Sequence, residues 1–265
     1  MEKIELNRIY NEDCLEGMKR IPSNSVDCII CDLPFGTTAC AWDSVIPMPP
    51  LWEQYKRVLK HQGSVLLFGS EPFSTMLRMS NLEWFKYDWI WRKNVPTGFQ
   101  HAKNMPMKDY EIISVFSGAG MGHANLLGEN RMTYNPQGLK SCHVVENGQS
   151  KFKNTVGKRP SHKEIVVREQ CNYPRMIITF DNQSGDGVNN KRIHPTQKPL
   201  DLIRYLVLTY TNMGDTVLDN CMGSATTAIA CMKEKRNFVG FELDKDYYEK
   251  ACKRIESERQ QLTLF

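Results

Sequence analysis

The segment TVLDNCMGSATT, residues 216–227, predicts a strand, a tight turn at Gly223 and the start of a helix. A turn of this kind lies at the carboxyl end of a strand, where α/β folds bind ligands, and its free backbone N–H groups suit an anionic group. A single glycine lacks the three-glycine dinucleotide pattern, and the same segment could be plain connectivity. The next predicted strand, however, ends at Glu242, whose carboxylate could accept hydrogen bonds from two ribose hydroxyls. Together the two features indicate a ligand that contains adenosine.

On both sides of this segment, short apolar runs alternate with amphipathic stretches of helical period, which is the pattern of a doubly wound parallel sheet. The expected strands are 8–10, 26–31, 64–68, 87–91, 112–116, 216–219 and 238–242, and the expected helices are 14–20, 50–60, 72–79, 200–211, 225–233 and 245–259. Residues 118–192 lose this rhythm and are rich in Gly, Asn, Lys and Arg. We therefore expect residues 1–117 and 193–259 to be two halves of one α/β domain, 118–192 to be an insertion or small lobe, and 260–265 to be a tail.

The composition is that of an ordinary globular protein. The 265 residues suffice for one sizeable core, and no apolar run of about 18 residues predicts a membrane span. The amino terminus, with Glu2, Lys3 and Glu5, lacks the apolar stretch of a signal peptide, so we expect a cytoplasmic protein. Nine cysteines without regular spacing fit a reducing compartment. Cys28 and Cys31 form a C-x-x-C pair, but they lie in a predicted strand and should point to opposite faces, so two core residues are favoured over a metal site.

The net charge of +4 is unevenly distributed along the chain. Residues 118–192 hold eleven Lys and Arg against six Asp and Glu, whereas the rest of the chain holds 23 against 24. A basic segment in an otherwise neutral protein suits contact with a polyanion such as DNA, although charged loops are often only solvated. The candidate DNA contacts are Arg131, Lys140, Arg159 and Lys163, with Tyr134, Gln137 and His162 as further candidates for reading bases.

The tetrapeptide Asp32-Leu33-Pro34-Phe35 directly follows the predicted strand 26–31 and should therefore lie at the carboxyl edge of the sheet. There a carboxylate, a proline-stiffened backbone and an aromatic ring converge on one spot. Asp32 and the carbonyl of Pro34 could accept the two N–H bonds of an amine whose lone pair is delocalised into a base, and Phe35 would stack on that base. The alternative is a turn in which Asp32 caps local backbone and Phe35 joins the core.

The order of these motifs resembles that of amino-group DNA methyltransferases of the β class. The tetrapeptide at Asp32 comes first, the string HPTQKP of residues 194–199 comes late, and the Asp219 loop follows it. In that family the tetrapeptide usually reads Asp-Pro-Pro-Tyr, and a target-recognition region, here 118–192, lies between it and the cofactor loop. The resemblance implies a Rossmann-like α/β fold with permuted motif order that binds S-adenosylmethionine.

The resemblance also implies roles for individual residues, and it places the strand around residues 89–93 beside the catalytic pocket. Leu33 and Phe35 replace the family's first proline and its tyrosine, which keeps the acceptor and the stacking surface, whereas Cys221 and Ala225 stand where the family favours Phe and Gly. The implied catalytic residues are Asp32, Pro34 and Phe35, and the implied cofactor contacts are Asp13, Thr196, Lys198, Asn220, Cys221, Gly223, Ser224 and Glu242.

The resemblance predicts an enzyme that moves a methyl group from S-adenosylmethionine to N6 of adenine in double-stranded DNA, as restriction-modification methyltransferases do. The target base would leave the helix stack, because its amino nitrogen cannot reach the methyl group from within a duplex. An Asp rather than a Ser at position 32 favours adenine over N4 of cytosine, the nearest alternative. A DNA-binding relative without catalysis and a methyltransferase for RNA or small molecules are further alternatives.

The last five residues, Gln261 to Phe265, resemble the peptide with which bacterial replication proteins dock on the sliding clamp. Gln261 would be the polar anchor, and Leu264 and Phe265 would bury apolar surface worth about 3 to 6 kcal/mol. The alternative is an ordinary helix end whose apolar residues pack back on the protein. The sequence leaves open the recognition site and whether the chain forms a homodimer.

Overall fold

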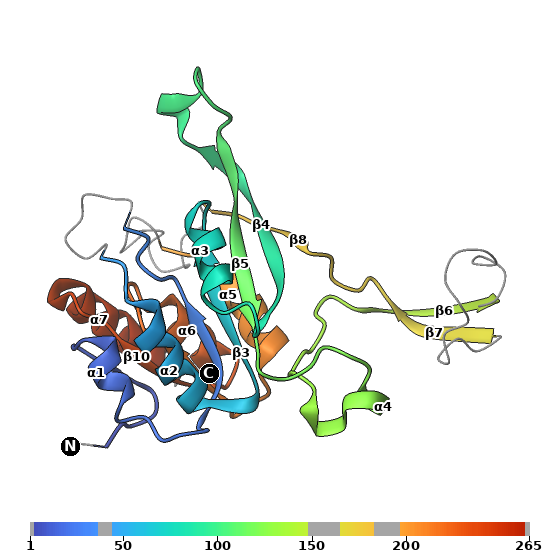
Figure 1. Cartoon of the computed structure of the whole chain (residues 1–265), viewed down its shortest axis with the longest axis horizontal. Coiled ribbons are helices and arrows are strands. Elements are labelled where there is room, and N and C mark those ends of the chain that lie inside the picture. Colours follow the sequence, from blue (N-terminus) through green and yellow to red (C-terminus); the bar gives the residue numbers. More distant parts are fainter. Residues whose placement is uncertain (1–2, 37–43, 148–164, 183–196, 263–265) are drawn as a thin grey trace. The chain divides into compact units, whose positions relative to one another are not determined.

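The computed structural model describes residues 3–36, 44–147, 165–182 and 197–262 (Figure 1). The chain divides into two compact units, one formed by Met1–Asn135 with Met176–Phe265 and the other by Pro136–Arg175.

The second unit covers a shorter stretch of sequence than the insertion expected over 118–192, because residues 118–135 and 176–182 belong to the first unit. Within the second unit, β6 (Lys140–Asn147) pairs antiparallel with β7 (Ile165–Cys171). Polar residues dominate β6, and β7 has only a three-residue apolar run before Arg168, Glu169 and Gln170, which explains why no strand was predicted there.

An eight-stranded sheet forms the centre of the first unit. Its strands lie in the order β1 (Arg8–Tyr10), β10 (Asn237–Phe241), β9 (Thr216–Asp219), β2 (Val26–Cys31), β3 (Leu59–Gly69), β5 (Lys108–Phe116), β4 (Phe85–Thr97) and β8 (Ile177–Phe180). Strand β9 pairs with both β10 and β2, so strands from both halves of the chain lie in one sheet.

One strand departs from the expected all-parallel sheet. Strand β5 runs antiparallel to both β3 and β4, whereas the other pairs of the sheet are parallel. A parallel pair needs a crossover of a dozen or more residues, usually a helix. The connection from β4 to β5 instead closes through the short turn η1 (Phe99–His101), so β5 has to run back along β4. The start of β5 therefore lies at the edge of the sheet where the parallel strands end.

Helices cover both faces of the sheet, as a doubly wound fold requires. One face carries α1 (Cys14–Met18), α2 (Met48–Val58) and α3 (Phe73–Ser80), and the other carries α5 (Leu200–Tyr210), α6 (Thr226–Lys233) and α7 (Lys245–Leu262) (Figure 1). Along β2, Cys28 lies in the core with α5 to α7, and Cys31 lies in the core with α1 to α3. The C-x-x-C pair thus points to opposite faces, as the strand pattern predicted. In the described part of the chain, no helix has both the length and the apolarity of a membrane span.

Three parallel strands end together at the edge that matters for function. The register pairs Ile29 of β2 with Leu218 of β9, and Asp219 of β9 with Gly240 of β10. The residues that follow these strands therefore emerge side by side. This carboxyl edge is where open α/β sheets bind ligands.

Candidate active site

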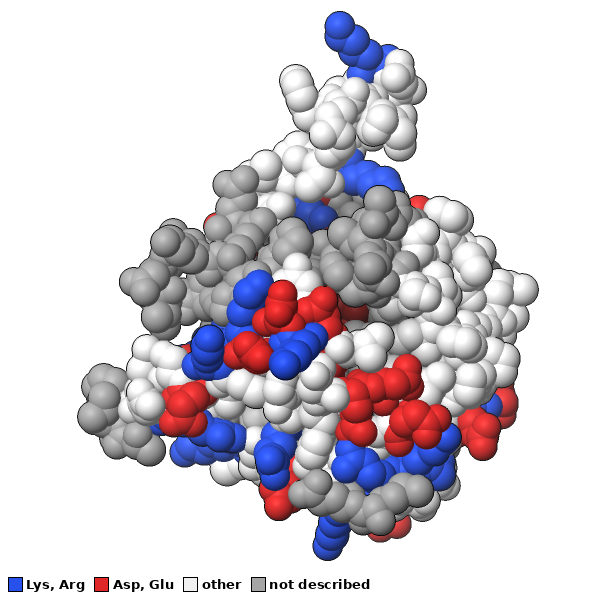
Figure 2. Space-filling view, turned by 90° about the vertical axis from the view of Figure 1, so that its left-hand side faces the viewer, with Lys and Arg blue, Asp and Glu red and all other residues white. Residues whose placement is uncertain are grey.

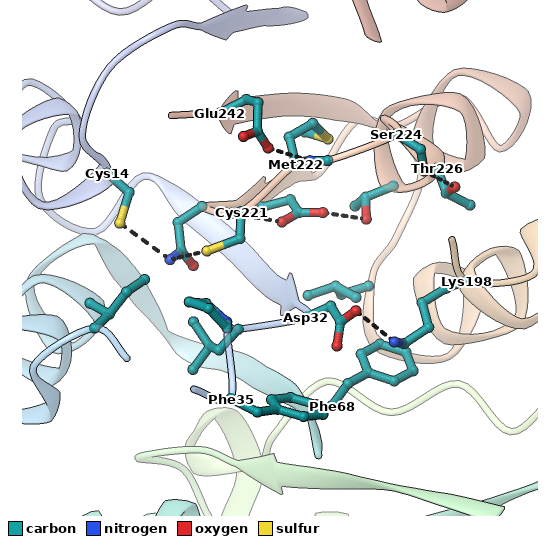
Figure 3. Close-up of a pocket in the computed structure, with 18 of the residues that line it drawn as sticks. Cys14, Asp32, Phe35, Phe68, Lys198, Cys221, Met222, Ser224, Thr226 and Glu242 are labelled. Atoms are coloured by element: carbon teal, nitrogen blue, oxygen red, sulfur yellow. Dashed lines mark hydrogen bonds and ion pairs between the residues drawn. The ribbon is translucent and has the colours of Figure 1, made fainter. Parts of the chain in front are cut away.

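A cavity of about 540 Å³ is lined by residues that follow three of the parallel strands (Figure 3). Asp32, Pro34 and Phe35 come from the loop after β2, residues 220–224 from the loop after β9, and Glu242 from the end of β10. The volume falls within the range of roughly 300–1,000 Å³ that is typical of small-ligand sites. The loops after β2 and β9 thus open into one space, which the chemistry expected from the sequence requires.

Asp32 belongs to a chain of four charged side chains. The Lys198 Nζ atom lies 2.5 Å from Asp32 Oδ2 and 3.3 Å from Glu111 Oε2, and the Lys93 Nζ atom lies 2.5 Å from Glu111 Oε1. The side chains of Lys198 and Glu111 are only 11% and 16% exposed, so the network is largely buried. The second carboxylate oxygen of Asp32, Oδ1, is buried and has no hydrogen-bond partner among the described residues.

Burial and these ion pairs together determine the protonation of the network. Burial raises the pKa of Asp32, and Lys198 opposes that rise. Burial also acts to raise the pKa of Glu111, but Lys198 and Lys93 hold it below its usual value. Burial alone would lower the pKa of Lys198, whereas Asp32 and Glu111 raise it above its usual value. Asp32 is therefore the carboxylate of the pair with the increased proton affinity.

Aromatic side chains bound the cavity next to this network. Phe35 packs against Phe73 with ring centroids 4.7 Å apart, and it also lines the cavity. The Lys198 Nζ atom lies 5.1 Å from the centroid of the Phe68 ring, and Figure 3 shows Phe35 and Phe68 on the same side of Asp32. Phe35 thus contacts the core, as one sequence interpretation had it, while part of its surface stays open to a ligand.

The loop after β9 is held in shape by Asp219. Its carboxylate accepts hydrogen bonds from the Thr227 hydroxyl at 2.6 Å and from the backbone N–H of Cys221 at 3.1 Å. Burial raises the pKa of Asp219 to about 7. Gly223 and Ala225 adopt left-handed backbone conformations with φ of 52° and 62°. The turn at Gly223 is the one expected from the sequence, and Ala225 takes a conformation that glycine adopts more easily.

Asn220 connects this loop to the opposite wall of the cavity. Its Oδ1 atom accepts a hydrogen bond from the buried Tyr55 hydroxyl at 2.5 Å, and its Nδ2 atom lies 3.6 Å from the Sγ atoms of Cys14 and Cys221. Figure 3 shows both thiols pointing toward this amide. Cys14 and Cys221 line the cavity with sulfur atoms, which are soft and adaptable contact surfaces.

Glu242 ties the end of β10 to the same loop. Its carboxylate accepts the backbone N–H of Gly223 at 2.7 Å and the backbone N–H of Asp244 at 2.9 Å. Burial raises the pKa of Glu242. Each of the two oxygens therefore already has one donor, and the remaining lone pairs can accept from a ligand.

The other expected cofactor residues have local partners. Asp13 lines the cavity, but its carboxylate caps α1 by accepting the backbone N–H groups of Leu15 and Glu16. Ser224 is buried, and its hydroxyl lies 3.1 Å from that of Thr226. Lys198 lines the cavity with its ammonium directed at the two carboxylates. Thr196 lies outside the described residues.

The expected DNA and clamp contacts are only partly within the described residues. Arg131 is partly exposed in the first unit and Lys140 is exposed in the second, while Arg159, His162 and Lys163 lie outside the described part. Tyr134 packs against Tyr210 with ring centroids 6.0 Å apart, which favours a core role over base reading. Gln137 is half-buried in the second unit. Gln261 is exposed near the end of α7, and Leu264 and Phe265 lie outside the described residues.

Glu111, which lines the cavity, and Tyr55, which holds Asn220, were not singled out by the sequence, and Lys93 was placed beside the pocket only as part of the strand 89–93. A charged residue at the start of the apolar run EIISVF was a signal for Glu111. The parallel strand expected from the sequence, however, places residue 111 at the opposite edge of the sheet, away from Asp32. Tyr55 offered no signal, since it occupies an apolar position of an amphipathic helix.

Comparison with known proteins matches the site to a family. A family model described as DNA methylase, N6_N4_Mtase, matches residues 26–253. Type II methyltransferase M1.MboII of Moraxella bovis is 27% identical over 94% of this chain and 96% of its own length. DNA adenine methyltransferase YhdJ of Escherichia coli strain K12 is 26% identical over 95% of this chain and 83% of its own length.

A solved structure agrees with the fold. The M1.HpyAVI–SAM complex is 24% identical and superposes with a TM-score of 0.59 over 93% of this chain and 98% of that one. The family match runs from β2 into α7 and so includes the tetrapeptide, the charged network and the loop after β9. The chain therefore belongs to the DNA methylase family.

Proposed function

We propose that this chain transfers a methyl group from S-adenosylmethionine to the exocyclic amino nitrogen N6 of adenine in DNA. The observation that carries the proposal is that Asp32, whose Oδ1 atom has no partner among the described residues, lines the same cavity as the Gly223 loop. Membership of the DNA methylase family and the similarity to a DNA adenine methyltransferase support the same activity.

The residues of the cavity fit S-adenosylmethionine in size and chemistry. Glu242 supplies acceptor oxygens for ribose hydroxyls, and Cys14, Leu15 and Cys221 supply apolar surface for a flat base. The Gly223 turn brings backbone groups close to the ligand without a side chain in the way, since nothing but the Cys221 carbonyl would lie near an added Cβ. When bound, the cofactor supplies a methyl group on a positively charged sulfur, which an amine can attack.

Asp32 has an oxygen placed to accept a hydrogen from an amino group and a raised pKa that lets it accept a proton. Lys198 holds its Oδ2 atom at 2.5 Å and leaves Oδ1 for a donor from the substrate. Asp32 and the Pro34 carbonyl accept the two amino hydrogens, which favours the pyramidal geometry in which nitrogen is nucleophilic. The nitrogen–carbon bond would form as the carbon–sulfur bond of the cofactor breaks, with a neutral thioether as the leaving group, and the nitrogen would lose a proton. Asp32 takes that proton, because burial raises its pKa.

Phe35 presents a stacking surface beside this acceptor. Its contact with Phe73 fixes the ring, and its open side lines the cavity. A base that leaves the duplex exchanges its stacking neighbours for this ring. Stacking of one base on an aromatic side chain contributes about 1 to 3 kcal/mol.

Hydrogen bonding at position 32 does not by itself decide which base is methylated. An Asp there accepts hydrogens from either adenine or cytosine, because both carry an exocyclic amino group. Similarity to the adenine enzyme YhdJ favours adenine, and N4 of cytosine is the second candidate, since the family name includes both positions. We also retain Arg131, Lys140, Arg159 and Lys163 as proposed DNA contacts.

Labelled methyl transfer tests the proposal directly. The protein is incubated with methyl-labelled S-adenosylmethionine and either duplex DNA or RNA, and the labelled nucleoside is identified after digestion. We expect label in N6-methyladenine from DNA. Asp32→Ala should abolish transfer while cofactor binding, measured by calorimetry, persists, and Asp246→Ala, on the surface of α7, should behave as wild type. Label only in RNA, or unchanged transfer by Asp32→Ala, would contradict the proposal.

The tail and the assembly state are separate proposals. We retain Gln261, Leu264 and Phe265 as a docking peptide for a bacterial sliding clamp, on sequence grounds alone. Capture by a purified clamp should be lost when Leu264 and Phe265 are deleted, and unchanged capture would end the idea. A homodimer also stays a prediction, which sedimentation of the full chain would test.

A further inference from the structure

The hairpin formed by β4 and β5 extends beyond its sheet. Strand β3 pairs with β5 no further than Gly69 opposite Ile112, and β8 pairs with β4 no further than Lys93 opposite Phe180. Within the described structure, β4 and β5 have only each other as strand neighbours past these points, and Figure 1 shows them projecting from the sheet. We call residues 96–108 the hairpin tip.

The hairpin tip has a defined shape. Gly98 adopts φ of 87° and opens the turn η1, which is closed by a hydrogen bond from the His101 N–H to the Gly98 carbonyl at 2.9 Å. The N–H groups of Asn104 and Met105 both donate to the His101 carbonyl, at 2.8 and 3.0 Å. The Asn182 side chain anchors the base of the tip by two hydrogen bonds of 3.1 Å to the backbone of Val95. The backbone of the tip is therefore held in a defined turn.

The composition of the tip is that of a contact surface. Every residue from 96 to 108 is exposed, and Phe99 is 82% exposed at the turn. The tip, residues 96–108, contains two lysines, Lys103 and Lys108, and no Asp or Glu. Figure 2 shows basic and uncharged atoms at the projecting end. An exposed large aromatic ring among cations indicates a partner with both apolar and anionic surfaces.

The tip stands next to the cavity of the active site. Trp91, Lys93 and Thr97 of β4 line that cavity, and Phe99 follows Thr97 by only two residues. A partner that places one base beside Asp32 extends well beyond the cavity. It would therefore also contact the tip.

We propose that the hairpin tip binds the DNA duplex beside the target base, with Phe99 entering the base stack and Lys103 and Lys108 contacting phosphates. The proposal rests on the proposed function, because it takes the substrate to be duplex DNA. A base that leaves the stack opens a gap, and apolar side chains are the usual wedges between base steps. Lysines that contact phosphates release counterions, so each contact makes binding depend more steeply on salt.

Phe99→Ala tests the wedge, and Met213→Ala is its matched control. Met213 is 71% exposed and precedes β9, so it lies at the opposite edge of the sheet. We expect Phe99→Ala to lower kcat/KM for duplex DNA by about 5- to 150-fold, the range that loss of one stacking contact gives. Fluorescence of 2-aminopurine placed at the methylated position should rise less than with wild type. The melting temperature and the Kd for S-adenosylmethionine should not change, and Met213→Ala should match wild type throughout.

Lys103→Ala tests the phosphate contact, with exposed Lys253 on α7 as the control. A plot of log Kd for duplex DNA against log salt should become shallower by about 0.9 for Lys103→Ala and stay unchanged for Lys253→Ala. DNA affinity is measured without turnover, so it tests DNA binding by the tip even if wild type methylates no DNA. A lack of methylation would count against the proposed function alone. Wild-type kcat/KM and fluorescence in Phe99→Ala would overturn the proposal. So would a change in self-association with unchanged DNA affinity.

Discussion

Replacing Lys198 by Met removes the cation that lies between two carboxylates. Lys198 Nζ is 2.5 Å from Asp32 and 3.3 Å from Glu111, and Met keeps most of the side-chain volume without the charge. Lys93 remains paired with Glu111 at 2.5 Å, so Asp32 is the group that loses its nearest compensating charge and keeps only the weaker effect of Lys93. Burial then raises the pKa of Asp32 with less opposition than in wild type.

The stability cost of Lys198→Met follows from the burial of the pair. Breaking a buried ion pair by removing one partner costs about 3 to 5 kcal/mol. The Asp32 side chain is 27% exposed and Lys93 still neutralises Glu111, so we expect the lower end, about 3 kcal/mol. At about 2 to 4 °C per kcal/mol for a protein of this size, the melting temperature should fall by roughly 6 to 12 °C.

A pH profile separates the catalytic effect of Lys198→Met from its effect on stability. Single-turnover methyl transfer, measured below the melting temperature of the variant, should show its acid limb moved to higher pH, because Asp32 stays protonated longer. Activity should recover toward wild type as the pH rises. Adding Glu111→Gln removes the second carboxylate and should return part of both the stability and the acid limb. An acid limb in the wild-type position, or a double variant with strictly additive losses, would refute the reasoning.

Three further predictions concern other parts of the site. Asp219→Asn removes a carboxyl whose pKa burial raises to about 7. Between about pH 4 and 7 the folded protein keeps this proton, whereas the unfolded chain loses it. The free energy of unfolding of wild type therefore falls as pH rises, by up to about 4 kcal/mol relative to the variant. Urea unfolding of both proteins from pH 4.5 to 8 checks this, and parallel curves would contradict it. Gly17→Ala puts a Cβ 2.2 Å from the ring of Phe241 and should lower the free energy of unfolding, measured in urea, by about 1 to 3 kcal/mol. Because Glu242 follows Phe241, the variant should also bind the cofactor more weakly in calorimetry. An unchanged Kd would show that packing at Gly17 does not affect binding. Phe35→Ala should raise KM for DNA by the equivalent of about 1 to 3 kcal/mol with an unchanged cofactor Kd, and wild-type KM would remove Phe35 from base capture.

The parallel strands of the sheet could be predicted from the sequence, because their apolar runs alternate with helical segments as parallel topology requires. The strands β2, β9 and β10 are mostly apolar, as strands buried on both faces require, and each is followed by a residue that lines the cavity. The direction of β5 was not accessible. An apolar run predicts a strand without its orientation, and only the length of the connection from β4 indicates a hairpin.

That single error of direction explains much of what was missed in the site. In an all-parallel sheet Glu111 would lie at the amino edge, far from Asp32. Because β5 is antiparallel, its first residues share the edge with the ends of β2 and β4, which brings Glu111 between Lys93 and Lys198. Lys198 was expected at the cofactor on the strength of resemblance. Its contact with Asp32 depends on a pairing across 166 residues of sequence, which no local pattern encodes.

The two acceptors of the cavity differ in a way that suits a transfer reaction. Glu242 has both oxygens engaged by backbone N–H groups, so its position is fixed before any ligand arrives. Asp32 has one oxygen fixed by Lys198, and its other oxygen is buried with no donor from the described part of the chain. An unsatisfied buried acceptor costs about 1 to 3 kcal/mol, and this free energy is recovered only when a donor arrives. In the proposed reaction this acceptor lies where an amino group must become nucleophilic, and a hydrogen bond that strengthens as charge develops on nitrogen would lower the barrier rather than merely tighten the complex.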